Sequence, residues 1–124
     1  MRLRPRTAAD PAEVARLGKV LLLGRDAALR SWAAQALAER GLVSAYAYLR
    51  HAFWDPVESV RESAVQAVAA LAVRQSAAEL EALYARSGPR MRQIILRAVR
   101  RIGCRPEFDA VLRLARDEIP SRRV

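Results

Sequence analysis

The stretch that decides the fold is residues 55–71, which read DPVESVRESAVQAVAAL. Its valines, alanines and final leucine recur every three or four residues, which is the spacing of a helix with one buried face. Asp55 followed by Pro56 predicts a helix N-cap with proline in the first turn. We therefore expect a helix over 57–71 that packs by one face against neighbouring helices.

The same pattern occurs three times along the chain. A shift of 31 residues brings ALRSWA (28–33), SVRESA (59–64) and RMRQII (90–95) into register without a gap. The columns of the three segments are Leu29-Arg30, Val60-Arg61 and Met91-Arg92; Ala36, Ala67 and Ala98; Leu37, Val68 and Val99; and Gly41, Ala72 and Gly103. The segments between them add the columns Leu42, Val73 and Cys104; Leu49, Leu80 and Val111; and Ala52, Leu83 and Leu114. A fixed period of this length indicates repeated structural units that share one core.

The repeats predict an all-α chain with helices at residues 11–23, 27–40, 42–54, 57–71, 75–86, 89–102 and 105–118. Gly41 and Gly103 fall where a helix C-terminus favours a left-handed residue, and Ser87-Gly88-Pro89 separates two helices. We interpret residues 1–124 as a single domain with an arm (1–10), repeats at 11–41, 42–72 and 73–103, a terminal cap helix (104–118) and a tail (119–124). Each repeat would be an antiparallel helical hairpin, and the hairpins would form an α-solenoid.

The composition supports this class and limits the function. Apolar residues make up 52% of the chain but aromatic residues only 6%, so strong helix formers such as alanine and leucine dominate. The net charge of +9, carried by arginines and Lys19, indicates acidic partners without choosing among protein, nucleic acid and lipid. A single cysteine, Cys104, excludes an intramolecular disulfide framework. The apolar run Val20–Leu23 is too short for a membrane span, so we expect a cytoplasmic protein.

The middle repeat resembles a HEAT repeat, in its Asp55-Pro56 turn, its Val60-Arg61 pair and its alanines at helical spacing. The first repeat has Gly24 and the third Arg86 where the middle one has the aspartate. The period is shorter than the ~40–47 residues of HEAT and armadillo units and is similar to that of short HEAT-like repeats, including those of phycobilin lyases. The resemblance implies an α-solenoid whose second helices line a concave face, and protein binding as the commonest role. It also implies that the turn aspartate and helix arginine bond across repeats, which makes Asp55 and Arg61 candidates, with Arg30 and Arg92.

The expected concave face carries a basic patch on its third repeat only. Its residues are Ala28, Ser31, Gln35 and Glu39; Ser59, Glu62, Gln66 and Ala70; and Arg90, Gln93, Arg97 and Arg101. At 100° per residue the arginines Arg86, Arg90, Arg97 and Arg101 fall within about 60°, with Arg100 nearby, and no acidic residue occurs between Glu81 and Glu107. Three interpretations of such a stripe are open: a solvated helix face, a binding site for an acidic protein or peptide, and a nucleic-acid binding site. The first two repeats lack it, which disfavours nucleic acid.

Other reactive or anchoring side chains have ordinary structural explanations. His51 has no second histidine or ligand set at metal spacing, and we predict no metal and no cofactor. Cys104 shares a column with Leu42 and Val73, which predicts a buried, inert thiol. Trp32 and Trp54 are expected at the edge of the core, although exposed tryptophans would be binding anchors.

We therefore predict a protein-interaction scaffold or adaptor, not an enzyme. The binding residues would be Gln35, Gln66, Arg86, Arg90, Arg97, Arg100 and Arg101, and the ligand an acidic protein or peptide surface. One alternative is a nucleic-acid binding module without sequence preference. Another is a HEAT-like lyase or glycosylase-type enzyme, or a subunit of one, which a deep pocket at Trp32 or Trp54 would favour. The identity of the partner and the oligomeric state stay open.

Overall fold

A computed structural model describes residues 11–41, 43–103 and 105–118, and the regular structure of these residues is helical, without a strand. The elements are α1 (Pro11–Leu23), α2 (Ala27–Glu39), η1 (Val43–Ala45), α3 (Tyr46–Ala52), α4 (Glu58–Ala70), η2 (Arg74–Ser76), α5 (Ala77–Ala85), α6 (Pro89–Ile102) and α7 (Arg105–Glu118). The all-α class and the predicted helices are confirmed. Two segments differ, because the helices predicted at 42–54 and 75–86 each begin with a turn of 3-10 helix.

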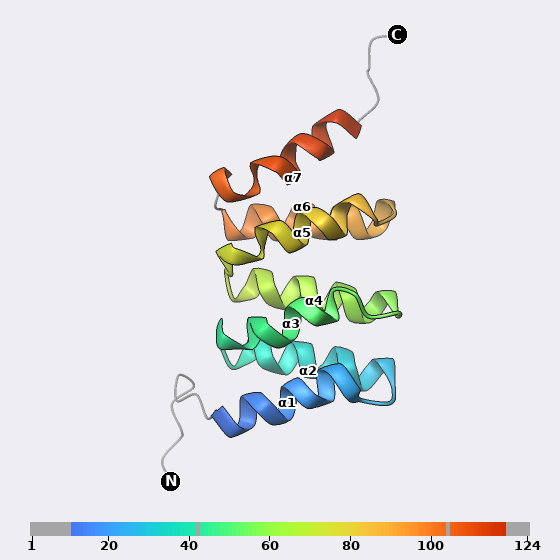
Figure 1. Cartoon of the computed structure of the whole chain (residues 1–124), viewed down its shortest axis with the longest axis vertical. Helices are drawn as coiled ribbons and strands as arrows, with labels where there is room; N and C mark the ends of the chain where they lie inside the picture. Colours follow the sequence, from blue (N-terminus) through green and yellow to red (C-terminus); the bar gives the residue numbers. More distant parts are fainter. Residues whose placement is uncertain (1–10, 42, 104, 119–124) are drawn as a thin grey trace.

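The helices follow one another in sequence order along the long axis of the molecule (Figure 1). The helices α2, α4 and α6 form one layer, in which α2 packs on α4 and α4 on α6. A second layer holds α1, α3 and α5, and α7 packs against α5 at the end of the molecule. Residues that are far apart in sequence therefore meet mainly across neighbouring helices of one layer.

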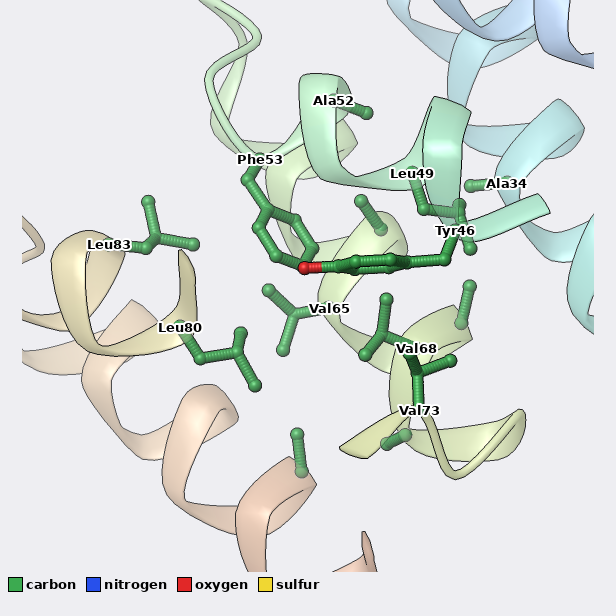
Figure 2. Packing of buried hydrophobic residues seen from close by; sticks show 14 of the residues in the cluster. Ala34, Tyr46, Leu49, Ala52, Phe53, Val65, Val68, Val73, Leu80 and Leu83 are labelled. Carbon is green, nitrogen blue, oxygen red and sulfur yellow. The ribbon is translucent and has the colours of Figure 1, made fainter. Parts of the chain in front are cut away.

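The core lies between these two layers. Figure 2 shows Tyr46 and Phe53 near α4, with Val65 on one side and Leu80 of α5 beyond it. Phe53, Val65 and Leu80 are fully buried, and each such side chain contributes about 1.5–3 kcal/mol through its removal from water. The aromatic rings of Tyr46 and Phe53 meet edge to face, with centroids 6.5 Å apart.

Most column residues that the structure describes are buried in equivalent places, but Leu29 and Leu114 are 43% and 38% exposed while the other members of their columns are buried. Leu37, Val68 and Val99 are 0%, 0% and 3% exposed, which confirms that prediction. Ala67 and Ala98 are also buried, but Ala36 is partly exposed. Ala67 lies on α4 and Ala98 on α6, and each of these helices packs on the preceding helix of its layer. Within the described residues α2 has no such predecessor, so the same column stays open to solvent.

A left-handed backbone recurs at the end of each helix of this layer. The φ angles are +67° at Gly41, +53° at Ala72 and +76° at Gly103, at intervals of 31 residues. The predicted left-handed C-termini at the two glycines are thereby confirmed. Alanine at the middle position is strained, because its Cβ crowds the backbone in this region.

The arginine that follows the apolar residue in each repeat anchors the loop before its helix. Arg30 Nη1 donates to the carbonyl of Gly24 (2.8 Å), and Arg61 Nη1 donates to the carbonyl of Asp55 (2.6 Å). In the third repeat Arg92 Nε donates to the carbonyl of Tyr84 (2.9 Å) and its guanidinium lies 4.9 Å from the Tyr84 ring centroid. Each of these bonds satisfies a carbonyl near the end of the preceding helix.

The prediction that Asp55 is the N-cap of the middle helix is wrong. The helix α4 begins at Glu58 with Val57 as N-cap, and no side chain caps it. Asp55 Oδ1 instead accepts a hydrogen bond from the Val57 backbone N–H (2.9 Å) while the carboxylate binds Arg30. The position of the helix start explains the difference, because Asp55 lies two residues before the N-cap and its carboxylate bonds to the N–H of the N-cap itself, not to those of the first helical turn.

Some predictions lie outside the described residues: those on the arm (1–10), the tail (119–124), Leu42 and Cys104. Among the helices of the described part, none has the length and apolar character needed to cross a membrane.

Candidate functional site

The basic face of α6 follows from the amphipathic sequence of that helix. Gly88 is its N-cap and Pro89 occupies its first turn, as Ser87-Gly88-Pro89 predicted. Its apolar positions Met91, Ile94, Ile95, Ala98 and Val99 are buried. Arg97 and Arg101 are four residues apart, one turn along the helix, and both are exposed.

A depression lies between α4 and α6 on this exposed face, and we call it the α4–α6 groove. Its volume is about 420 Å³, and it is lined by Gln66, Ala69, Ile94, Arg97, Ala98 and Arg101. Ala69, Ile94 and Ala98 are 5%, 7% and 3% exposed, so they form an apolar floor. Alanine at positions 69 and 98 leaves room that a larger side chain would fill. The structure thus brings together three of the predicted binding residues, Gln66, Arg97 and Arg101.

Within the part of the chain that the structure describes, the arginines at this end of α6 have no counter-ion. The guanidinium groups of Arg97, Arg100 and Arg101 form no hydrogen bond or ion pair with any described side chain or backbone group. Arg100 and Arg101 lie in the last turn of α6, where the helix dipole favours positive charge. The dipole therefore offsets part of the mutual repulsion, while the hydrogen-bonding capacity of the guanidinium groups stays available.

Arg90 is not free for a ligand. Its Nε and Nη2 donate to the two carboxylate oxygens of Glu62 on α4, at 2.9 and 3.3 Å. The hydrogen bond that Arg90 donates to Glu62 and the negative charge of Glu62 raise the pKa of Arg90 above the ordinary value. The expectation of a stripe without acidic neighbours is wrong at this position, because Glu62 is 28 residues away in sequence and reaches Arg90 across the helix layer.

Two other predicted binding residues lie away from the groove. Gln35 is exposed on α2. Arg86 is the C-cap of α5, outside α6, because α6 begins only at Pro89. The prediction that Arg86 continues the helical stripe is therefore wrong. Its guanidinium lies 5.3 Å from the centroid of the Trp54 ring, a cation–π contact.

Both tryptophans are more exposed than a position at the edge of the core implies. Trp54 is 42% and Trp32 is 53% exposed. Trp32 shares its column with Ser63 and Ile94, each 7% exposed, which lie on helices that have a preceding neighbour in their layer. A depression of about 330 Å³ adjoins Trp32, with Leu17 and Ala36 in its lining. We therefore correct the core-edge prediction for both residues.

A third depression lies between two loops, and we call it the Trp54 pocket. Its volume is about 380 Å³. The residues that line it are Trp54, Asp55, Pro56, Glu58, Arg61, Leu83, Arg86, Ser87, Gly88 and Met91. Sequence reasoning assigned Arg61 a structural role only and did not group it with Trp54 and Arg86.

The chemistry available on these surfaces is ion pairing and hydrogen bonding. Guanidinium groups bind carboxylates through two parallel hydrogen bonds, and an adjacent apolar floor accepts a hydrocarbon side chain.

His51 is exposed. Within the described residues, no three side chains of histidine, cysteine, aspartate or glutamate gather as they would to hold a metal ion. Sequence reasoning also missed the apolar floor of the α4–α6 groove, although the alanine at position 98 was a signal for open space.

Comparisons of the chain with protein-family models, with curated proteins and with solved structures find no match.

Proposed function

We propose that this protein is a protein-interaction scaffold: a HEAT-like α-solenoid of antiparallel hairpins whose exposed α2–α4–α6 face is concave. In this proposal the α4–α6 groove binds an acidic segment of a partner protein. The observation that supports it most is the arrangement of Arg97 and Arg101. These two arginines lie one turn apart, have no described counter-ion, and line a groove with an apolar floor.

The ligand that complements this groove is a peptide with carboxylates on either side of an apolar residue. The carboxylates would pair with Arg97 and Arg101, and the apolar side chain would contact Ile94 between the two alanines. Gln66 on the opposite wall offers an amide that both donates and accepts hydrogen bonds to a peptide backbone. Binding would also remove the remaining repulsion between the two arginines.

The distribution of charge on the exposed face favours a protein ligand over nucleic acid. A nucleic-acid backbone presents a phosphate at every nucleotide and calls for cations along the whole binding surface. On this face α2 contributes the exposed carboxylate of Glu39, and α4 contributes Glu62, which already neutralises Arg90. Among the described residues of this face, the arginines without a carboxylate partner therefore lie toward the end of α6.

The decisive experiment compares two double variants with the same change in net charge. Arg97→Glu/Arg101→Glu alters the groove, whereas Arg25→Glu/Arg74→Glu alters exposed arginines outside it. Each protein is titrated, with fluorescence anisotropy as the readout, against a labelled peptide of alternating glutamate and leucine. A polyglutamate peptide and a single-stranded oligonucleotide serve as comparison ligands.

We expect the glutamate–leucine peptide to bind the wild type and the Arg25/Arg74 variant, and to lose binding to the Arg97/Arg101 variant. Its affinity should fall as salt rises, because exposed charges are screened over about 8 Å at physiological ionic strength. Equal binding by both variants would show that the groove is only a solvated face. Tighter binding of the oligonucleotide than of either peptide would favour the nucleic-acid function instead. Capture from native lysate after nuclease treatment then identifies the partner, as the protein that only the Arg97/Arg101 variant loses.

A further inference from the structure

The first two repeats share an arginine position but differ in the ion pair that it makes. Arg30 anchors itself on the Gly24 carbonyl and holds the Asp55 carboxylate of the next repeat, with Nε–Oδ2 and Nη2–Oδ1 distances of 2.8 and 3.1 Å. Asp55 stands 25 residues after Arg30. This pair shows that the guanidinium at this position of a repeat can bind a carboxylate through its Nε and Nη2.

Arg61 occupies the same position one repeat later and pairs with no carboxylate among the described residues. It is anchored in the same way, because its Nη1 donates to the Asp55 carbonyl at 2.6 Å. The residue 25 positions after Arg61 is Arg86, a cation instead of an aspartate. Arg61 is half-buried and forms no ion pair with a described carboxylate. The second repeat thus presents a prepared guanidinium without its anion.

Open space lies beside Arg61. Arg61 and Arg86 both line the Trp54 pocket, whose volume is about 380 Å³. Trp54 holds the Arg86 guanidinium by the cation–π contact at 5.3 Å, so this second cation is also positioned. Leu83 and Met91 add apolar wall, which suits the methylene groups of an acidic side chain.

We propose that the Trp54 pocket binds a carboxylate against Arg61, as Asp55 binds against Arg30 in the repeat before. The ligand would be an acidic side chain of a partner peptide. Asp55 and Glu58 in the lining disfavour a phosphate dianion or a nucleic-acid backbone, since like charges repel at short range. The site shares no residue with the α4–α6 groove, so this inference does not depend on the function proposed above.

The direct test uses small carboxylates as probes and the arginine Nε–H resonances as the readout. Acetate should shift the signals of Arg61 and Arg86 and the Trp54 indole N–H saturably, with a Kd of the order of millimolar, as expected of so small a ligand. The Arg61→Gln variant should lose these shifts, while Arg97→Gln should retain them. The inference is overturned if acetate produces no saturable shift, or the same shift in Arg61→Gln. Inorganic phosphate binding more tightly than acetate would also overturn it.

Two further probes separate the possible sources of the carboxylate. N-acetyl-aspartate N-methylamide carries only a side-chain carboxylate with the C-terminus blocked, whereas N-acetyl-alanine carries only an α-carboxylate. Binding of the aspartate derivative with at least the affinity of N-acetyl-alanine supports an acidic side chain. Binding of N-acetyl-alanine alone would contradict it and assign the pocket to a chain terminus.

A variant that supplies the missing carboxylate gives an independent test. Arg86→Asp should pair with Arg61 as Asp55 pairs with Arg30, and should therefore melt roughly 3–5 °C above the charge-removing control Arg86→Gln. It should also no longer bind acetate, because its own carboxylate fills the place. The difference between the two variants should vanish in an Arg61→Gln background. An Arg86→Asp protein no more stable than Arg86→Gln, or one that still binds acetate, would overturn the inference.

Discussion

Arg30 and Asp55, which are 25 residues apart, form a two-point ion pair between the first and second repeats. Their side chains are only 12% and 9% exposed, and the Asp55 carboxylate raises the pKa of Arg30 by its hydrogen bond. The HEAT-like pattern led us to expect a bond across repeats between the turn aspartate and a helix arginine. The arginine that provides it is Arg30, whereas Arg61 donates to the backbone carbonyl of Asp55 and to no described carboxylate.

This pair should act as a unit in the stability of the fold. Asp55→Asn and Arg30→Gln should each lower the urea midpoint, because each leaves the other charge shielded from water without its partner. The double variant should be no less stable than the less stable of the two single variants, since the second substitution removes the charge that the first left without its partner. Urea unfolding of the four proteins measures this, with Glu58→Gln at the exposed first residue of α4 as control. Strictly additive losses would mean that the two side chains do not interact in solution.

Replacing Ala72 with glycine should stabilise the protein. At φ +53° an alanine carries strain that glycine does not, so Ala72→Gly should raise the free energy of unfolding by about 0.5–1 kcal/mol. Ala82→Gly, at an exposed position inside α5, should lower it by about 0.5–1 kcal/mol. Thermal or urea unfolding distinguishes the two. If both substitutions destabilise equally, position 72 does not adopt the left-handed conformation in solution.

Val68 and Gln66 test the assignment of faces on α4. Val68 is fully buried and Gln66 is exposed, although they are only two residues apart. Val68→Asp should cost several kcal/mol, roughly 4, because an unpaired charge enters the core. Gln66→Ala should change the free energy of unfolding by no more than about 0.5 kcal/mol. Comparable losses for the two variants in calorimetry would show that the helix faces are assigned wrongly.

Glu79 should make the stability depend on pH in the acidic range. Its carboxylate accepts hydrogen bonds from the Tyr46 hydroxyl at 2.6 Å and from Arg50 Nη2 at 2.7 Å. The bond from Tyr46, followed by that from Arg50, lowers the pKa of Glu79 below its ordinary value of 4.5. Burial and the neighbouring Glu79 raise the pKa of the Tyr46 hydroxyl, so the proton stays on the phenol.

The sign follows from proton binding in the two states. Because the folded carboxyl has the lower pKa, the unfolded chain binds more protons in this range, and the stabilisation is present above pH 4.5. It is lost as the pH falls through the folded pKa. The difference in unfolding free energy between wild type and Glu79→Gln should therefore shrink below pH 4.5. Tyr46→Phe should make this pH dependence of the stability smaller. If the difference in unfolding free energy between wild type and Glu79→Gln does not change from pH 7 to pH 3, the lowered pKa of Glu79 is contradicted.

Local patterns in the sequence were sufficient to predict the helices. Apolar spacing and the glycine and proline positions predicted the seven helices, with two of them differing only by a first turn of 3-10 helix. The period of 31 residues predicted the burial of Leu37, Val68 and Val99 and the exposure of Gln66, Arg97 and Arg101. These properties depend on the direction in which a side chain leaves its own helix, and that direction follows from the helical period alone.

Only the tertiary structure decided which of these side chains have partners. Glu62 neutralises Arg90 from the neighbouring helix, and Trp54 holds Arg86 from another loop, so two predicted binding residues are engaged within the protein. Trp32 is exposed because, among the described residues, no helix covers the face of α2 that carries its column. Ion pairs, cation–π contacts and exposure at an end of the helix layer depend on distances between elements far apart in the chain. A repeat pattern aligns such residues in columns, but only the packing of one helix on the next determines which of them meet.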